Sequence, residues 1–432
     1  MPERYEVRYF GAGPALLPTE VLEDAAKALL NYDETGLGLA EQSHRSERAW
    51  DILKKTKADL AAFLDIPSNY EILFMQGGGS GQFSSVVYHL VGAWVQRKKG
   101  ELIESLFGGK SEEEITQDEL VAELKKSIQS ELKLDYLITG SWSLKAYQEA
   151  TRLLGQDHVN VVTDSRAINN SGKFGKIAEE SDWKLSNDPA FVYYCDNETV
   201  DGVEFPQFPA ALAPNKDGAG PIVVADMSSN ILSRRVPIEN FGVMFFGAQK
   251  NLGPPGITVV IINKDLLPPV TPQPSPALMR ALGLPIAPVV LSYETTEKHN
   301  SLYNTLPIFD VYIAGQVLKR LLLTFPNRVA DQEALAKQKA DIIYAALEEH
   351  PDIYRIVPDK SVRSRMNICF RVTMTKDIKD SELEFLELAK DRGLIGLKGH
   401  RSVGGIRASN YNSVSLESAV ELAEFLRFYA KK

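Results

Sequence analysis

The chain has 432 residues, with 57 acidic and 48 basic side chains and a formal net charge of −9. Its length allows two domains and a large core, and its acidic balance, with no basic tract, argues against a nucleic-acid partner. No stretch approaches the ~18 apolar residues of a membrane span, and the first residues show no apolar or Arg/Ser-rich targeting segment. Two cysteines are too few for a disulfide framework. We therefore expect a cytoplasmic protein without a membrane partner.

Short apolar segments alternate with helical ones from about residue 70 to 263. The predicted strands are 71–75, 134–139, 159–163, 191–195, 222–226, 243–247 and 257–263. Several are almost continuous apolar runs, as expected for strands that are covered on both faces. The pattern predicts an α/β fold with a mainly parallel seven-stranded sheet between helices.

A glycine-rich loop, Gln76-Gly-Gly-Gly-Ser-Gly-Gln82, separates the first strand from a helix predicted over 83–94. Free backbone N–H groups at such a helix start can bind an anion. The loop lacks the Gly-Lys-Ser/Thr of a Walker motif, and Gln82 replaces the last glycine of Gly-x-Gly-x-x-Gly. Taken alone, it could equally be a tight turn.

The segment 96–133 is dense in Glu and Lys and resembles an insertion. Ser111–Glu114 and Thr116–Glu119 both match the capping-box pattern of a helix start. One apolar stripe follows at Leu120, Leu124, Ile128 and Leu132. We predict a helical excursion on the surface with a solvated outer face; a helix that docks a partner is the alternative.

Two polar residues each end an apolar run. Asp226 follows Pro221–Ala225, and Lys250 follows 243–249 and precedes a Gly/Pro-rich turn. Polar residues at the carboxyl ends of strands face the ligand crevice of an α/β sheet. Burial lowers the pKa of a lysine there and makes its amine a nucleophile, while a carboxylate can hold a ring nitrogen protonated.

Pyridoxal phosphate (PLP) needs these two groups and an anion site. Considered singly, Lys250 could be a surface lysine, and Asp226 could be a helix N-cap or a turn residue. Their combination with the glycine loop predicts a PLP enzyme with Lys250 as the Schiff-base lysine.

The C-terminal part reads as a second, smaller α/β unit after a Pro-rich irregular segment, 264–310. Helices are predicted over 310–324 and 329–349. The elements that follow are a strand over 353–357, a strand over 366–373, a helix over 382–392, a strand over 395–408 and a helix over 415–430.

Seven motifs, in order along almost the whole chain, carry a resemblance to a known family. They are Gly13-Pro-Ala with Leu17-Pro18, Ser43-His-Arg45, Gln76-Gly-Gly-Gly, Asn197-Glu-Thr199 with Asp201-Gly202, Gly247-Ala-Gln-Lys-Asn251, Tyr303-Asn-Thr305, and Lys398-Gly-His-Arg401 with Gly404-Gly405 and Arg407-Ala-Ser409. Through them the chain resembles the phosphoserine aminotransferases, which are class-V, fold-type-I PLP enzymes. The insertion after Gln96 makes it most similar to the fungal members.

The resemblance implies a domain division and a set of cofactor contacts. A large PLP-binding domain would cover 17–318, with 96–133 inserted, and a small domain 319–432, on which residues 1–16 would pack. Lys250 would carry the cofactor and move the proton, and Asp226 would pair with the pyridine nitrogen. The other contacts would be Gly79, Ser80 and Gln249 at the phosphate, Trp142 stacked on the ring, Thr199 at its phenolic side, and Asn304 and Thr305 at the phosphate from the partner subunit of a homodimer. Without the resemblance, Trp142 would be a core residue, Thr199 a turn residue and 304–305 an ordinary loop.

A cationic set would bind the substrates: His44, Arg45, His400, Arg401 and Arg407. Such a set suits a doubly anionic ligand, because arginine binds carboxylate or phosphate through two hydrogen bonds; the alternative is that some of the five are surface ion-pair residues. The resemblance assigns the α-carboxylate to Arg407, and the phosphate or the glutamate side-chain carboxylate to the other four.

Two positions depart from the bacterial pattern. Ser80 replaces an arginine, so one cationic contact is missing or is supplied elsewhere. Ala12 replaces a serine that precedes Gly13, where a backbone contact to substrate survives but a hydroxyl contact does not.

The implied reaction is ping-pong transamination of 3-phosphohydroxypyruvate with L-glutamate, giving O-phospho-L-serine and 2-oxoglutarate in serine biosynthesis, without a metal. A cysteine desulfurase is the nearest alternative, but Cys195 and Cys369 both lie in apolar strand patterns, which are typical of inert core cysteines. A non-catalytic phosphate-binding interaction protein is the alternative from another class.

Overall fold

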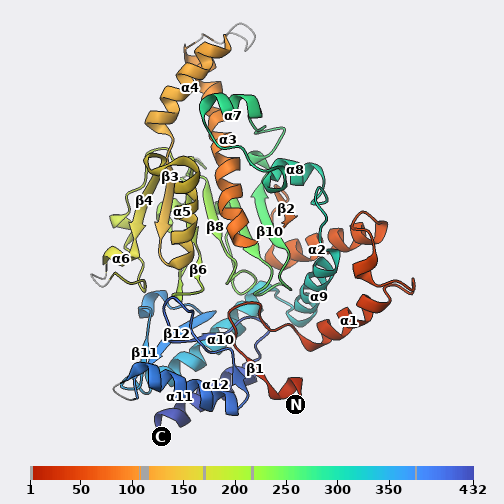
Figure 1. Ribbon diagram of the computed structural model, residues 1–432, viewed down its shortest axis with the longest axis vertical. Coiled ribbons are helices and arrows are strands. Elements are labelled where there is room, and N and C mark those ends of the chain that lie inside the picture. The colour runs from red at the N-terminus through yellow and green to blue at the C-terminus, as the bar shows by residue number, and fades with distance from the viewer. Residues whose placement is uncertain (1–2, 107, 109–115, 169–171, 216–217, 375–376) are drawn as a thin grey trace.

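The computed structural model describes residues 3–106, 108, 116–168, 172–215, 218–374 and 377–432. A large α/β body contains the central sheet, and a smaller C-terminal part lies below it (Figure 1). The first strand of the chain lies with this smaller part, far in sequence from its partners there. Among the described residues, no helix combines the length and the apolar character needed to cross a membrane.

The central sheet has seven strands. Their spatial order is β2 (Tyr70–Met75), β10 (Thr258–Asn263), β9 (Val243–Gly247), β8 (Val223–Asp226), β5 (Phe191–Cys195), β3 (Leu134–Ile138) and β4 (Val159–Asp164). Only β10 runs antiparallel to its two neighbours, β2 and β9. The prediction of an α/β fold with a mainly parallel seven-stranded sheet is confirmed.

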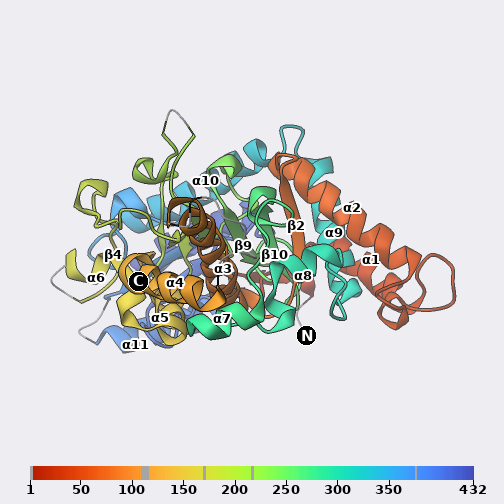
Figure 2. The same cartoon turned by 90° about the horizontal axis from the view of Figure 1, so that it is seen from above.

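Both faces of the sheet are covered, which explains why its strands are continuously apolar. In β9, Val243 and Phe245 belong to the core beneath α3 (Gly78–Leu106) and α5 (Ser141–Leu154). Met244 and Phe246 belong to the core beneath α2 (Glu47–Leu64) and α9 (Ile308–Thr324). Seen from above, α2 and α9 lie with α1 (Thr19–Leu30) at one end of the molecule (Figure 2).

Helix α3 is longer than predicted, because its glycine loop forms the first turn and because Val95, Leu102 and Ile103 continue its apolar face beyond Trp94. Helix α4 (Gln117–Glu131) then projects from the body (Figure 1). Thr116 Oγ1 accepts a hydrogen bond from Glu119 N at 3.4 Å, so half of that predicted capping box forms; Ser111–Glu114 lies outside the described residues. The stripe of Leu120, Leu124, Ile128 and Leu132 is buried, as predicted.

The C-terminal part contains an antiparallel sheet of β11 (Tyr354–Ile356), β12 (Asn367–Val372) and β14 (Ile406–Ser409). Helices α10 (Val329–Glu348), α11 (Ile378–Asp391) and α12 (Leu416–Ala430) pack on it. Strand β1 (Arg8–Tyr9) pairs in parallel with β13 (Leu394–Ile395), and Phe10 is buried in the same core. The remaining elements are short: α6 (Ser165–Ile168), β6 (Asn197–Glu198), β7 (Val203–Glu204), α7 (Pro276–Leu282) and α8 (Tyr293–Lys298).

The prediction of one strand over 395–408 is wrong. Strands β13 and β14 are separated by a loop, because Gly396, Gly404 and Gly405 have φ of +81°, +69° and +77°, values that break an extended chain and that side chains rarely adopt. His400 and Arg401 therefore lie on a loop.

Candidate active site

A cavity of about 470 Å³ opens beside the turn that follows β9. Seven of the predicted site residues line it together with Gly77 and Gly78 of the glycine loop: Ala12, Trp142, Thr199, Gln249, Lys250, His400 and Arg407. Segments from the N-terminus, the large sheet and the C-terminal part thus converge on one site.

Lys250 is held at this cavity by the strand before it. All five residues of β9 are buried, and Lys250 Nζ donates a hydrogen bond of 2.6 Å to Thr199 Oγ1. Burial lowers the pKa of Lys250, against the opposing charge of Asp226. A lowered pKa increases the fraction of neutral, nucleophilic amine.

Asp226 ends the neighbouring strand β8 and is only 5% exposed. Its Oδ1 accepts hydrogen bonds from Ser228 N at 2.8 Å and Ser228 Oγ at 2.6 Å. Its Oδ2 faces the first turn of α3, since a Cβ added to Gly79 would lie 3.5 Å from it. Burial raises the pKa of Asp226, while the Ser228 hydrogen bonds and the charge of Lys250 oppose this shift.

The glycine loop is shaped as an anion site. Gly77 and Gly78 have φ of +100° and +64°, and Gly78 N donates to Thr258 Oγ1 at 2.9 Å. Helix α3 begins at Gly78, so Gly79 and the exposed Ser80 lie in the first turn, whose N–H groups lack helical partners.

Two buried carboxylates that the sequence analysis did not assign fix the cavity wall at Trp142. Glu198 accepts from Trp142 N at 2.8 Å through Oε2, and from Ser143 N at 2.9 Å through Oε1. Asp201 Oδ2 accepts from Ser141 N at 2.7 Å. Burial, followed by the charge of Asp201, raises the pKa of Glu198 to about 8. Together these carboxylates cap α5 and keep Trp142 and Thr199 in adjoining parts of the wall.

The glycine at the N-cap of α5 makes room for these carboxylates. Gly140 precedes α5 without a side chain of its own, and a Cβ there would lie 2.3 Å from Glu198. A glycine at this N-cap therefore pairs with an acidic residue elsewhere in the chain, within the Asn197-Glu-Thr199 motif.

The predicted cationic residues fall into two groups. Arg407, on β14, donates from Nη1 to Thr199 O at 3.1 Å, and its Nε is buried without a hydrogen-bond partner among the described residues. Burial, then the charges of Arg407, Lys145 and Arg401, lowers the pKa of His400. Arg407 and His400 therefore line the cavity, whereas Arg401 is exposed beside His400 and does not line it.

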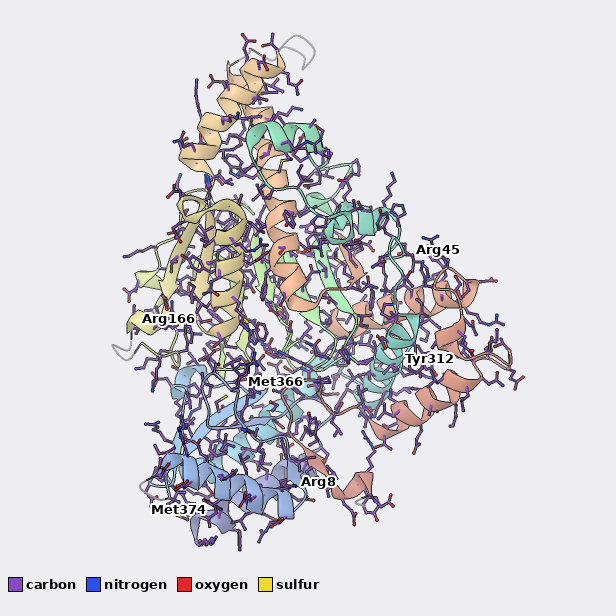
Figure 3. The ribbon with its side chains drawn as sticks, viewed as in Figure 1. Arg8, Arg45, Arg166, Tyr312, Met366 and Met374 are labelled. Atoms are coloured by element: carbon purple, nitrogen blue, oxygen red, sulfur yellow. The ribbon has the colours of Figure 1, made fainter. Side chains whose placement is uncertain are left out.

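His44 and Arg45 do not join them within one chain. Arg45 is exposed just before α2, far from Met366 (Figure 3), and Met366 Sδ lies 3.8 Å from Nδ2 of Asn251, the neighbour of Lys250. The Nε2 atom of His44 is buried and has no hydrogen-bond partner in the part of the chain that the structure describes.

Asn304 and Thr305 are exposed beside the start of the glycine loop. Asn304 Nδ2 donates to Gln76 Oε1 at 2.8 Å, and Gln76 Nε2 donates to Thr305 O at 2.6 Å. The segment thus lies next to the loop of its own chain and remains open to contact from outside.

The site fits PLP and does not fit desulfurase chemistry. It combines an amine of lowered pKa, a buried carboxylate, an anion loop, and the indole Nε1 of Trp142, which is buried without a partner among the described residues. Cys195 and Cys369 are buried, and burial raises the pKa of Cys195 well above its usual value and that of Cys369 to about 12. Neither thiol is therefore suited to attack as a thiolate.

Comparisons with known proteins agree with this chemistry. The family model "Aminotransferase class-V" matches residues 7–113 and 121–418. Phosphoserine aminotransferase of Saccharomyces cerevisiae is 40% identical over 437 residues, covering 100% of this chain and 99% of its own, and that of Drosophila melanogaster is 40% identical, covering 97% and 98%. Among solved structures, PLP-bound phosphoserine aminotransferase from Trichomonas vaginalis has a TM-score of 0.77 at 33% identity, covering 98% of this chain and 99% of that one. The chain therefore belongs to the class-V aminotransferase family and, within it, to the phosphoserine aminotransferases, and it is a PLP-dependent transaminase.

Proposed function

We propose that the chain transfers the amino group of L-glutamate to 3-phosphohydroxypyruvate, giving O-phospho-L-serine and 2-oxoglutarate for serine biosynthesis. The observation that carries this proposal is the double use of Thr199, whose hydroxyl accepts from Lys250 Nζ and whose carbonyl accepts from Arg407. The nucleophilic amine of Lys250 and the guanidinium of Arg407, which can bind a carboxylate, are thus both positioned by Thr199. A cytoplasmic location remains part of the proposal.

Each side chain of the site then has one task. Bound PLP supplies an electron sink that allows the Cα–H bond of an amino acid to break. Arg407 would bind the α-carboxylate of both substrates through two hydrogen bonds. Lys250 would hold the cofactor, and its amine would carry the Cα proton. Asp226 would keep the ring nitrogen protonated.

The direct test mixes purified holoenzyme with L-glutamate and 3-phosphohydroxypyruvate. We expect 2-oxoglutarate and O-phospho-L-serine to form in equal amounts. L-cysteine as sole substrate should release no sulfide, because both thiols are buried. A holoenzyme that forms 2-oxoglutarate with other keto acids but not with the phosphorylated one would contradict the proposed substrate.

Replacing Arg407 with alanine should impair both half-reactions, because both substrates carry an α-carboxylate. A hydrogen bond to a charged group contributes about 1.5–3 kcal/mol, so kcat/KM should fall roughly 10- to 150-fold for each substrate. Arg401→Ala is the matched control, since it should weaken phosphorylated substrates more than alanine-like ones. Equal losses on both kinds of substrate would refute this division of roles.

We further propose a homodimer in which Asn304 and Thr305 reach the cofactor phosphate of the partner subunit. The exposure of both residues beside the glycine loop supports this, as does the position of His44 and Arg45, which could serve only the site of another chain. The division into domains 17–318 and 319–432, with residues 1–16 packed on the second, belongs to the same proposal.

A shared site links cofactor affinity to assembly. Dilution below the dimer dissociation constant should release PLP, and the apo form should dissociate at higher protein concentrations than the holo form in a sedimentation series. Asn304→Ala with Thr305→Ala should weaken PLP retention. A monomer that keeps both cofactor and activity would disprove the shared site.

A further inference from the structure

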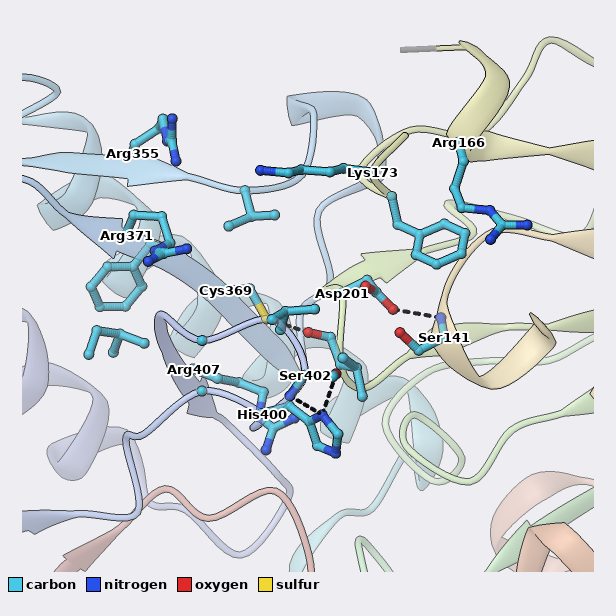
Figure 4. A pocket seen from close by; sticks show the side chains of 18 of the residues that line it. Ser141, Arg166, Lys173, Asp201, Arg355, Cys369, Arg371, His400, Ser402 and Arg407 are labelled. Atoms are coloured by element: carbon cyan, nitrogen blue, oxygen red, sulfur yellow. Dashed lines mark hydrogen bonds between the residues drawn. The ribbon is translucent and has the colours of Figure 1, made fainter. Parts of the chain in front are cut away.

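A second cavity, of about 480 Å³, adjoins the catalytic one and shares Val200, His400 and Arg407 with it. Its lining is strongly cationic (Figure 4). The basic residues are Arg166, Lys173, Arg355, Arg371, His400 and Arg407. The acidic residue in the lining is Asp201, which is already bonded to Ser141 N at 2.7 Å.

Strand register accounts for one wall of this cavity. Arg355 on β11 pairs directly with Arg371 on β12, and Cys369 on β12 pairs with Arg407 on β14. Because residues two apart on a strand point to the same face, the three arginines share one face of the small sheet. Like charges directly opposite each other destabilise a sheet.

This repulsion is only partly neutralised. Arg371 pairs with Glu382, with Nη2 and Oε2 3.3 Å apart. For Arg355 and for Lys173, on the facing segment, the described residues provide no acidic partner. Arg166, also on the facing side, pairs with Asp164 and lies 5.5 Å from the ring of Phe174.

We propose that this cavity is a second anion site, which binds a small phosphorylated acid beside the catalytic site. Arginine and lysine on two walls could contact a phosphate and a carboxylate at once, and the bound anion would relieve the repulsion between Arg355 and Arg371. The cavity volume suits a phosphorylated acid of a few carbons, the size class of the proposed substrate and product.

Occupation of this site should affect the catalytic one. Arg407 and His400 line both cavities. An anion in the second cavity therefore interacts with the same cations as the substrate and lowers the affinity for substrate, and bound substrate lowers the affinity for the anion by the same factor. This coupling rests on the proposed function; the binding of the anion itself does not.

The test titrates PLP holoenzyme with inorganic phosphate, followed by calorimetry in a phosphate-free, low-salt buffer. The double variant Lys173→Met with Arg355→Met should lose the second site, with phosphate affinity there falling about tenfold or more. The matched control is Lys176→Met, on the same segment, where the lysine pairs with Asp359 at 2.9 Å. That control should bind phosphate as the parent does.

Two further readouts separate the second site from the catalytic one. In the parent, phosphate should raise KM through both sites and leave kcat unchanged. In the double variant it should raise KM only by competing at the catalytic site, so the same phosphate concentration should raise KM less, while kcat/KM in phosphate-free buffer stays within about twofold of the parent. The Tm should not fall, because Arg355→Met removes a repulsive pair. Unchanged phosphate binding in the double variant would overturn the proposal, and so would a parallel loss of kcat/KM, which would assign both cations to the catalytic site.

Discussion

Replacing Lys250 with alanine should reduce transamination to below about 1% of the parent rate, because no other lysine among the described residues lines the catalytic cavity and could carry the cofactor and the Cα proton. The lysine is bonded to Thr199 Oγ1 at 2.6 Å, and burial lowers its pKa. The variant should also lose the yellow absorbance of lysine-bound PLP, while far-UV circular dichroism stays unchanged.

Lys264→Ala is the matched control for this variant. Lys264 follows the adjacent strand β10 as Lys250 follows β9, but its Nζ donates to Ser68 O at the surface. Its removal should leave turnover and colour intact. Substantial turnover by the Lys250 variant, or an equal loss in both variants, would show that Lys250 is not the catalytic amine.

The parts of the site that the sequence predicted are those governed by local rules. A strand buried on both faces must be apolar throughout, so a polar residue at its end is conspicuous; Asp226 and Lys250 could be found in this way. The turn at Gly77 and Gly78 was likewise visible, because it demands glycine.

What the sequence could not supply depends on distant contacts. Glu198 caps α5 across 55 positions of chain, and no local pattern links a buried glutamate to a glycine N-cap so far away. The error at 395–408 has a similar origin: apolar residues at both ends imitate one strand, while the glycines between them fold the chain back and β1, from the N-terminus, pairs with the first half.

The cationic set shows the same limit at a larger scale. Arg407 and His400 converge with Lys250 on one cavity, whereas Arg45 lies exposed elsewhere on the molecule. A sequence pattern can indicate that five cations suit an anionic substrate, but not which of them belong to the same site of the same chain.

Asp226→Asn should lower kcat about 100-fold, in the range seen when one preorganised electrostatic group is removed, while PLP still binds. Asparagine has nearly the same shape and can still accept from Ser228 N and Oγ through Oδ1. It cannot supply the negative charge that holds a ring nitrogen protonated. Burial already raises the pKa of Asp226, so the negative charge of its carboxylate has to be stabilised by a cationic partner. The protonated ring nitrogen would be that partner.

The loss should appear in the step that breaks the Cα–H bond. With glutamate deuterated at Cα, the variant should show slower single-turnover deprotonation and a larger isotope effect than the parent. Asp164→Asn, at the carboxyl end of the parallel edge strand β4, is the matched control and should keep the parent rate, since its carboxylate pairs with Arg166. If deprotonation in the Asp226 variant proceeded at the parent rate, the ring nitrogen would not need this carboxylate, and Asp226 would instead serve only to join β8 to β9 through Ser228, whose Oγ accepts from Gly247 N at 3.2 Å.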